Sequence, residues 1–578
     1  MSDDKPVYMP LQTLPADILF EVARYLANTD VLHLSVTSWT VYAKLIPAIY
    51  AVVDLRGAGQ CNHTLSMLQR YPHVARHVRR LVVRPERRNR HDSLPHVREW
   101  DKAGMVSRLV VTTARYMDVL QAFEWDGEDM LPDDRMWVEL RLRCPLLKSI
   151  GVSLGCFLPR PTSNLFQFNG LVSFSLTMKD GFYAHQLHVP SRESEPLFTR
   201  LLDMLTRRCP DLESLSIAGT SNEIADASLF WSARWPRLRL LELGDVISAP
   251  EPFLAFLEAH PTLEGLYLLG RPRALPDFVT LNRETLPSLC DFAGSLDTLR
   301  ALLERGQTGP TSPPSPLAKN LHRLCVPDPM QLRELTPLTI SHVLVDLQGL
   351  TSLELTFAPH SGHDSNSAFR TIVAACPQLL DLKLTCVCKP SFYLESFSRS
   401  LRNLTRLRTF ALTIVPFAGE EPMYAGAARM ALANPRLHSF SIAYIPYHTT
   451  PRPLPRTLER ANFELLVDTY GIPVGLRICE WRARLPPWKA VALVWDAGGR
   501  GRLAGWRSSK RGWTRQWVND LRQSGHPDAT GRGWAELLLE RSPAGEEARM
   551  LMFCFILVVL IALSITGRVI DDTYNNSR

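Results

Sequence analysis

The sequence predicts an α/β chain in which a short helical module precedes a long series of helix–strand units. Three observations support this. Apolar residues recur at helical spacing over 14–50, a Pro-x-Leu-x-x-Leu pattern returns repeatedly from about residue 70, and 550–567 carries no charge. With 46% hydrophobic and 21% charged residues in 578 positions, the composition is that of a globular protein. The 43 prolines favour many short elements over long helices.

Net charge and the distribution of cysteines indicate the cellular compartment in which the protein is expected. The formal net charge is +7, which is mild for a chain of this size. The 11 cysteines are scattered without framework spacing, which favours reduced thiols in the cytosol or nucleus over a secreted disulfide scaffold. The polar, acidic start at residues 1–6 predicts that no secretory signal begins the chain.

Residues 14–50 predict three short helices. Ile18, Val22 and Leu26 recur at steps of four and give the first helix an apolar stripe. The third helix is expected to end before Pro47. Because a module this small cannot bury so much apolar surface on itself, a partner or the next domain is expected to cover one face.

Three segments of this module, 14–26, 30–39 and 45–55, resemble the F-box of filamentous-fungal F-box proteins in order and spacing. One departure is Thr37-Ser38, where the family often has an apolar or Cys residue followed by a basic one. In the family, the domain docks on the Skp adaptor of a cullin-based ubiquitin ligase. The resemblance implies an F-box over 11–57 and an adaptor interface at or beside Leu14, Pro15, Ile18, Leu32, Leu34, Val36 and Trp39. The alternative interpretation is a generic three-helix cap that fills its own core.

The second pattern is clearest in Cys209-Pro-Asp-Leu-Glu-Ser-Leu-Ser-Ile, and its copies at 209, 235, 260 and 286 are 25 to 26 residues apart. This period lies within the range of about 20–29 that is typical of leucine-rich repeats. The last two apolar positions alternate and therefore face one side of a short strand. Segments before several copies are helical in pattern, so each unit is expected to be helix, Pro turn and strand.

One such unit buries too few apolar residues to offset the cost of ordering its backbone, so neighbouring units must stack. The sequence therefore predicts an irregular leucine-rich-repeat-like solenoid with insertions over 70–447, with a parallel sheet along its concave face. The alternative is an irregular α/β domain in which the Pro-x-Leu motifs are coincidental.

The segment 448–548 is predicted to be a linker region rich in Pro, Trp and Arg. Within it, 480–540 holds seven of the 13 tryptophans and a net charge of 11 − 6 = +5. Basic residues interleaved with aromatic ones can bind single-stranded nucleic acid or an anionic membrane surface. A loosely packed linker is the simpler interpretation, and no nucleic-acid partner is expected.

The uncharged segment 550–567, which begins at Met550, continues through Phe555 and Leu560 and ends at Gly567, predicts a transmembrane tail anchor. As a helix, its 18 residues would be about 27 Å long, close to the thickness of an endoplasmic-reticulum hydrocarbon core. The alternatives are an apolar helix buried against the solenoid, or a chain end from a wrongly joined reading frame.

The sequence contains no recognisable motif for bond chemistry. The glycine-rich run at 498–502 lacks Walker spacing, and Cys376, Cys386 and Cys388 lack a second ligand pair and a nearby His. The sequence therefore predicts a protein that is not an enzyme, with no catalytic residues, metal or cofactor.

The function expected from these patterns is that of a substrate receptor in a Skp–cullin–F-box ubiquitin ligase. It would bind the adaptor through the F-box and an unknown client through the repeats, and so promote protein ubiquitination. The alternative is a membrane-tethered F-box and repeat scaffold that acts outside a ligase. The chain is expected to face the cytosol, tail-anchored in an intracellular membrane, or otherwise to lie in the cytoplasm or nucleus.

Overall fold

The computed structural model describes residues 11–483 with gaps. The gaps are 27, 86–97, 128–133, 156–158, 160–161, 180–196, 220–224, 227, 245, 248–249, 270–277, 279–280, 283, 305–315, 332–336, 360–361, 388–393, 417–422, 435, 446–458 and 468–472. The chain divides into two compact units, Met1–Leu317 and Ala318–Arg578.

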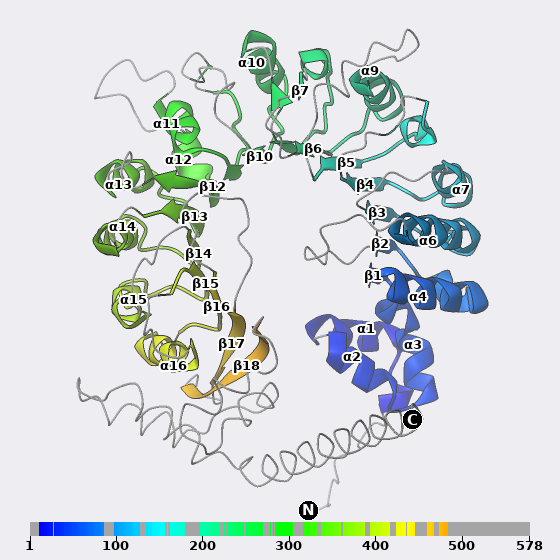
Figure 1. The fold of residues 1–578 in the computed structure, drawn as a ribbon, viewed down its shortest axis with the longest axis horizontal. Coiled ribbons are helices and arrows are strands. Elements are labelled where there is room, and N and C mark those ends of the chain that lie inside the picture. The colour runs from blue at the N-terminus through cyan, green and yellow to red at the C-terminus, as the bar shows by residue number, and fades with distance from the viewer. Residues whose placement is uncertain are drawn as a thin grey trace, which may run out of the picture. The chain divides into compact units, whose positions relative to one another are not determined.

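The first unit begins with a three-helix module (Figure 1). A 3-10 turn, η1 (Leu11–Thr13), leads into α1 (Ala16–Tyr25), α2 (Asn28–Ser35) and α3 (Trp39–Ile49). The expected end of the third helix before Pro47 was wrong, because α3 continues through this residue. Pro47 can remove only one helical hydrogen bond, and the Tyr50 amide still donates to the Ile46 carbonyl at 3.0 Å.

A parallel sheet of nine strands follows in the first unit, in the order β1-β2-β3-β4-β5-β6-β8-β10-β11. The strands are β1 (Val52–Arg56), β2 (Arg80–Arg84), β3 (Ala122–Asp126), β4 (Ser149–Leu154), β5 (Ser173–Met178), β6 (Ser214–Gly219), β8 (Leu240–Gly244), β10 (Gly265–Leu269) and β11 (Asp291–Ala293). Two short strands, β7 (Ala225–Asp226) and β9 (Val246–Ile247), pair separately.

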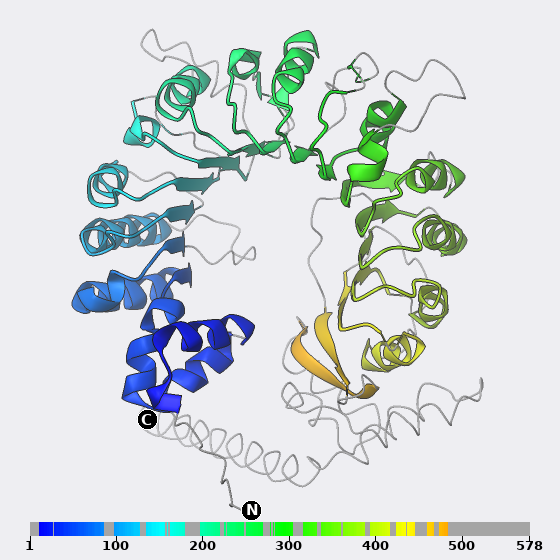
Figure 2. The same ribbon diagram turned by 180° about the vertical axis from the view of Figure 1, so that it is seen from behind.

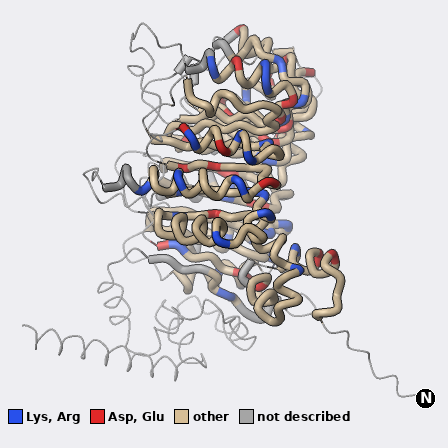
Figure 3. The backbone as a smooth tube through the Cα atoms, turned by 90° about the vertical axis from the view of Figure 1, so that its right-hand side faces the viewer, with Lys and Arg blue, Asp and Glu red and all other residues tan. Residues whose placement is uncertain are grey.

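The helices of this unit lie on one face of its sheet (Figure 1). They are α4 (Ala58–Arg70), α5 (Pro72–Ala75), α6 (Arg98–Ala114), α7 (Arg135–Arg143), η2 (Asn164–Gln167), α9 (Leu197–Asp203), the π-helical η3 (Met204–Arg208), η4 (Ser228–Ser232), α10 (Pro250–Glu258) and α11 (Leu296–Glu304). Figure 3 shows basic and acidic residues interspersed along the stacked elements.

The strand register explains why the units stack. Leu215, Leu241, Leu266 and Phe292 are successive partners across β6, β8, β10 and β11, and all four are buried. Each repeat contributes one side chain to this row, and that side chain would be exposed without the repeats on either side. The described chain is therefore an α/β repeat solenoid, as the sequence pattern predicted.

The second unit has the same plan. Its strands are β12 (Arg323–Gln331), β13 (Ser352–Ala358), β14 (Asp381–Cys386), β15 (Thr409–Ile414), β16 (Ser439–Tyr444), β17 (Glu459–Val467) and β18 (Pro473–Ala483). Its helices are α12 (Pro316–Asn320), which crosses the unit boundary, α13 (Pro337–Val345), α14 (Gly362–Ala375), α15 (Leu394–Leu401) and α16 (Met423–Ala433). In both views, α13–α16 lie on one side of the strands (Figure 1, Figure 2).

Strands β12–β16 are parallel, whereas β17 and β18 form an antiparallel hairpin against β16. This hairpin lies at 459–483, within the segment predicted to be a linker. It covers the hydrogen-bonding edge that the last parallel strand would otherwise expose. Similarly, β1 lies inside the range predicted for the F-box and forms the first strand of the sheet.

The carboxy-terminal predictions lie outside the described residues. These are the tryptophan-rich part of the linker beyond Ala483 and the membrane segment at 550–567. Within the ranges that are described, no helix has the length and apolarity needed to cross a membrane.

Candidate functional site

The three-helix module has a small core of its own. The buried residues at its centre are Leu19, Ala23, Val31, Val41 and Leu45. Leu14, Phe20, Leu34 and Ile49 are partly buried and pack against them. All three helices contribute to this cluster, so its packing fixes the outer faces of the module.

The structure divides the seven predicted adaptor residues into two sets. Five are exposed: Pro15, Ile18 (47%), Leu32 (51%), Val36 (75%) and Trp39 (76%). Leu14 and Leu34 instead pack against the core. The first set forms an outer surface, and the second set supports that surface from within.

The first helix carries two different apolar stripes. Ile18, Val22 and Tyr25 follow the i, i+4, i+7 spacing and are exposed, whereas Leu19 and Ala23 are buried. At 3.6 residues per turn, the two stripes lie about 100° apart around the helix. The stripe anticipated from the sequence therefore faces outward, and the adjacent stripe holds the core.

The adaptor interface expected from the sequence did not include Leu11, Val22, Tyr25 and Leu26, although all four are exposed. Of the 14 large hydrophobic residues that are exposed in the described ranges, eight lie between Leu11 and Trp39. We call these eight, together with Pro15, the apolar surface: Leu11, Pro15, Ile18, Val22, Tyr25, Leu26, Leu32, Val36 and Trp39. Exposed apolar side chains are therefore concentrated in this module within the described ranges.

Polar contacts hold the ends of the helices that carry this surface. The Ser38 hydroxyl accepts a hydrogen bond from the Thr40 amide at 3.3 Å, which caps α3 directly beside Trp39. The Trp39 ring lies 5.4 Å from the Tyr42 ring. The Ser35 hydroxyl donates to the Leu32 carbonyl at 2.7 Å at the end of α2. These contacts orient the turn between α2 and α3, which carries Val36 and lies between Leu32 on α2 and Trp39 on α3.

Lys44 joins the two ends of the module. Its ammonium donates to the Gln12 carbonyl at 3.0 Å and to the Leu14 carbonyl at 2.7 Å. These bonds fasten the segment before α1 to the middle of α3.

Two titratable groups that follow the module in the chain have raised pKa values. Burial, followed by Tyr42, raises the pKa of Tyr50. Burial also raises the pKa of the Cys61 thiol to about 11, which keeps it protonated and unreactive at neutral pH. No disulfide joins the cysteines that the structure describes, and no cluster of three or more metal-ligating side chains occurs there.

The open face of the first sheet carries a network of ion pairs on β1–β3 and just after β5. The pairs are Arg56–Asp54 (2.9 Å), Arg80–Glu124 (2.5 Å), Arg84–Asp54, Arg84–Asp126 (3.1 Å) and Lys179–Asp126 (2.6 Å). The matching positions on the next three strands hold only small residues: Ser149, Gly151, Ser153, Ser173, Ser175, Thr177, Ser214, Ser216 and Ala218. This face therefore has a charged section beside a section of small, mostly hydroxyl-bearing side chains.

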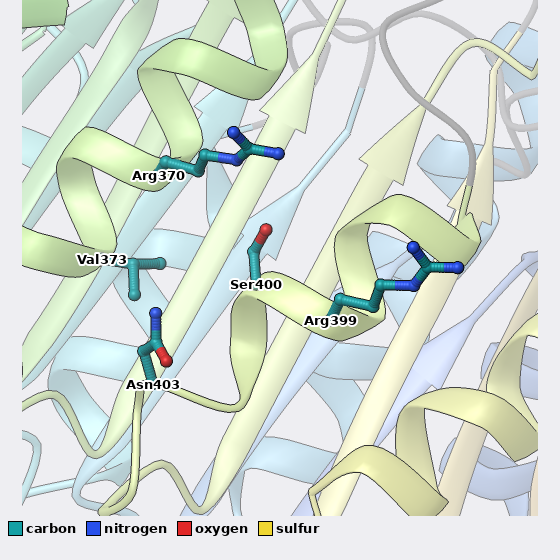
Figure 4. Close-up of a pocket in the computed structure, with 5 residues that line it drawn as sticks. All are labelled: Arg370, Val373, Arg399, Ser400 and Asn403. Carbon is teal, nitrogen blue, oxygen red and sulfur yellow. The ribbon is translucent and has the colours of Figure 1, made fainter.

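A pocket of about 260 Å³ lies between α14 and α15 in the second unit (Figure 4). It is lined by Arg370, Val373, Arg399, Ser400 and Asn403. The two arginines come from different helices and are exposed. The lining residues therefore present the guanidinium groups of two arginines together with the polar side chains of Ser400 and Asn403.

No family model matches the chain, and no curated protein matches it. Among solved structures, the crystal structure of the yeast Rad7–Elc1 complex matches with a TM-score of 0.34 and 14% identity. That match covers 70% of this chain and 93% of the other. The leucine-rich-repeat-containing protein LegL7 from Legionella pneumophila matches with a TM-score of 0.22 and 11% identity, covering 61% and 96%.

Both TM-scores lie below 0.5, so neither likeness assigns a family or a partner. The class of the protein follows from its own strands and helices, which form an α/β repeat solenoid preceded by a three-helix module.

Proposed function

We propose that this chain is a substrate receptor of a Skp–cullin–F-box ubiquitin ligase. The three-helix module would act as the F-box and dock on the Skp adaptor, and the repeats would hold a client protein. The observation that carries the proposal is the apolar surface, because eight of the 14 exposed large hydrophobic residues fall within the 29 positions from Leu11 to Trp39.

Exposed apolar side chains in this number promote aggregation unless a partner covers them. The resemblance of 14–55 to the F-box implies that this partner is a Skp adaptor. The module has a packed core, so it can present the surface without folding anew on binding. Trp39 is the natural energetic centre, since tryptophan is enriched among residues that dominate binding energy.

The client would bind to the open face of the sheet, where no described helix covers the strands (Figure 1). The receptor itself would carry out no bond chemistry. It would raise the effective concentration of the client near an enzyme that is recruited through the module.

The test is co-purification with a Skp adaptor. Changing Ile18 and Val36 to Asp should abolish recovery of the adaptor, because charge on the apolar surface would be desolvated on docking. The matched control changes Leu338 and Val345 to Asp, since both are exposed on α13 in the second unit. Equal recovery of the adaptor by the two variants would refute the proposal.

A second candidate function is a membrane-tethered scaffold that acts outside a ligase, and the uncharged segment 550–567 favours it. Under either function, the tether would leave the module and the repeats in the cytosol. Deleting 550–567 should release the chain from membranes. If deleting 14–50 also stops client turnover, the scaffold function is excluded and the receptor function retained.

A further inference from the structure

The segment that leads into α1 contributes an edge of the apolar surface. Leu11 and Pro15 are exposed there, and Leu14 packs on the core. The segment starts with only a short 3-10 turn, in which the Leu14 amide bonds to the Leu11 carbonyl at 3.4 Å. Pro15 caps α1 without a side-chain hydrogen bond. Local bonds of this kind hold a segment weakly, so its position depends on contacts with the rest of the module.

Lys44 supplies such a contact from 30 and 32 residues further along the chain. Its ammonium lies 2.7 Å from the Leu14 carbonyl and 3.0 Å from the Gln12 carbonyl. Hydrogen bonds from a charged donor are stronger than those between neutral groups. Two of the three N–H donors of Lys44 bond to these backbone oxygens. Within the described chain, Lys44 forms no ion pair that would compete with these bonds.

The helix that carries Lys44 is held firmly by the core of the module. Lys44 lies in α3 beside Leu45, which is completely buried, and Val41 lies one turn earlier and is also buried. The same helix begins at Trp39. Lys44 therefore connects the segment with Leu14 and Pro15 to the helix that presents the largest exposed aromatic side chain of the apolar surface.

We propose that Lys44 is a positioning residue for adaptor docking. Its ammonium holds 11–15 against α3, so that both ends of the apolar surface are in place before the adaptor arrives. The inference rests on the proposed function, since it concerns how that surface is prepared. A segment that is already ordered binds more tightly than one that must be ordered on contact, because the entropic cost has been met during folding.

The experiment compares the full chain with Lys44→Met, which keeps the aliphatic stem and removes the donors. Hydrogen exchange in peptides covering 11–19 should become about tenfold faster, and the Kd for the Skp adaptor should rise about tenfold. Lys44→Arg keeps the charge and the donors and should restore most of both effects. Lys148→Met is the matched control, since Lys148 also donates to a backbone carbonyl, at 3.4 Å, but in the repeats.

A double-mutant cycle separates positioning from general stability. If Lys44 acts through the segment, Lys44→Met in a Leu14→Ala background should weaken adaptor binding less than threefold. Exchange in α3 reports whether the module stays folded. If Lys44→Met unfolds it, Lys44→Gln repeats the measurements as a second neutral variant.

Three results are decisive. If the hydrogen-exchange rate of 11–19 in Lys44→Met equals that of the wild type, the positioning role is overturned. Faster exchange in this segment with an unchanged Kd for the adaptor would overturn it too. Full additivity in the cycle would overturn it as well. A wild-type chain that does not bind the adaptor would instead defeat the proposed function, and the exchange data would still show whether Lys44 holds the segment.

Discussion

Replacing Trp39 by alanine should weaken adaptor binding strongly and change folding little. A tryptophan side chain can bury about 200 Å², and Trp39 is 76% exposed, so about 150 Å² is available to a partner. At about 25 cal/mol per Å², this area corresponds to at most about 4 kcal/mol. Residues that dominate interfaces cost about 2 kcal/mol or more when truncated, so we expect a loss of about 2–4 kcal/mol. The Kd should rise about 30- to 700-fold.

The folded state should tolerate the same change. Trp39 contacts the Tyr42 ring at 5.4 Å, and losing such a pair costs about 0.5–1.5 kcal/mol. Isothermal titration with purified adaptor measures the Kd, and thermal unfolding measures stability on the same samples. Leu338→Ala serves as the control, because Leu338 is exposed outside the module. A Kd that changes less than threefold in Trp39→Ala would refute the reasoning.

Three further predictions concern the repeats. Burial lowers the pKa of His260, whose ring nitrogens contact the Phe256 carbonyl (2.6 Å) and the Trp235 amide (3.0 Å). The neutral imidazole therefore stabilises the fold above about pH 6.5, the pKa of an unperturbed histidine, and this stabilisation is lost as the pH falls below that value. The Tm should therefore drop more between about pH 7.5 and about pH 5.5 in wild type than in His260→Gln, and equal drops would contradict this assignment. Phe397→Ala should lower the free energy of unfolding by about 3–5 kcal/mol in urea denaturation, because its buried ring stacks on Phe369 at 4.1 Å and on Phe410 at 5.2 Å. A loss below about 1 kcal/mol would argue against this packing. Gly349→Ala should cost about 1–3 kcal/mol in the same assay, since the added Cβ would collide with the Lys319 carbonyl oxygen. A neutral effect would show that this close approach is absent.

The repeat strands could be predicted wherever a turn with the proline-containing motif precedes them. Cys209, Trp235, His260 and Leu286 each stand five residues before the first residue of β6, β8, β10 and β11. The turn fixes where the chain enters the strand, and the alternating apolar residues then fix which side is buried.

Other strands escaped sequence reasoning because the turn does not require proline. Before β3, the Leu120 amide donates to the Met117 carbonyl at 3.1 Å, much as the Leu238 amide donates to the Trp235 carbonyl at 3.0 Å before β8. The first turn has no proline after its leading residue, whereas the second has Pro236. The same backbone geometry therefore arises from a sequence that lacks the motif.

The division between core and surface in the three-helix module could not be read from residue types. Ile18 and Leu19 are both large, apolar and adjacent, yet one is exposed and the other is fully buried. The difference depends on which side of α1 meets α3, and this is a property of the packed bundle. Sequence reasoning found the module and most of its exposed residues, but it could not separate Leu14 and Leu34, which support the core, from the five that are exposed.

The central claim is that the apolar surface is covered by the adaptor, and oxidative footprinting of exposed side chains tests it most directly. In the free chain, Tyr25 and Trp39 should be oxidised readily, as should Tyr71 outside the module, because all three are exposed. Adding the adaptor should protect Trp39 and Tyr25 and leave Tyr71 unchanged. If the adaptor binds while Trp39 and Tyr25 remain as reactive as before, the account of this surface is contradicted.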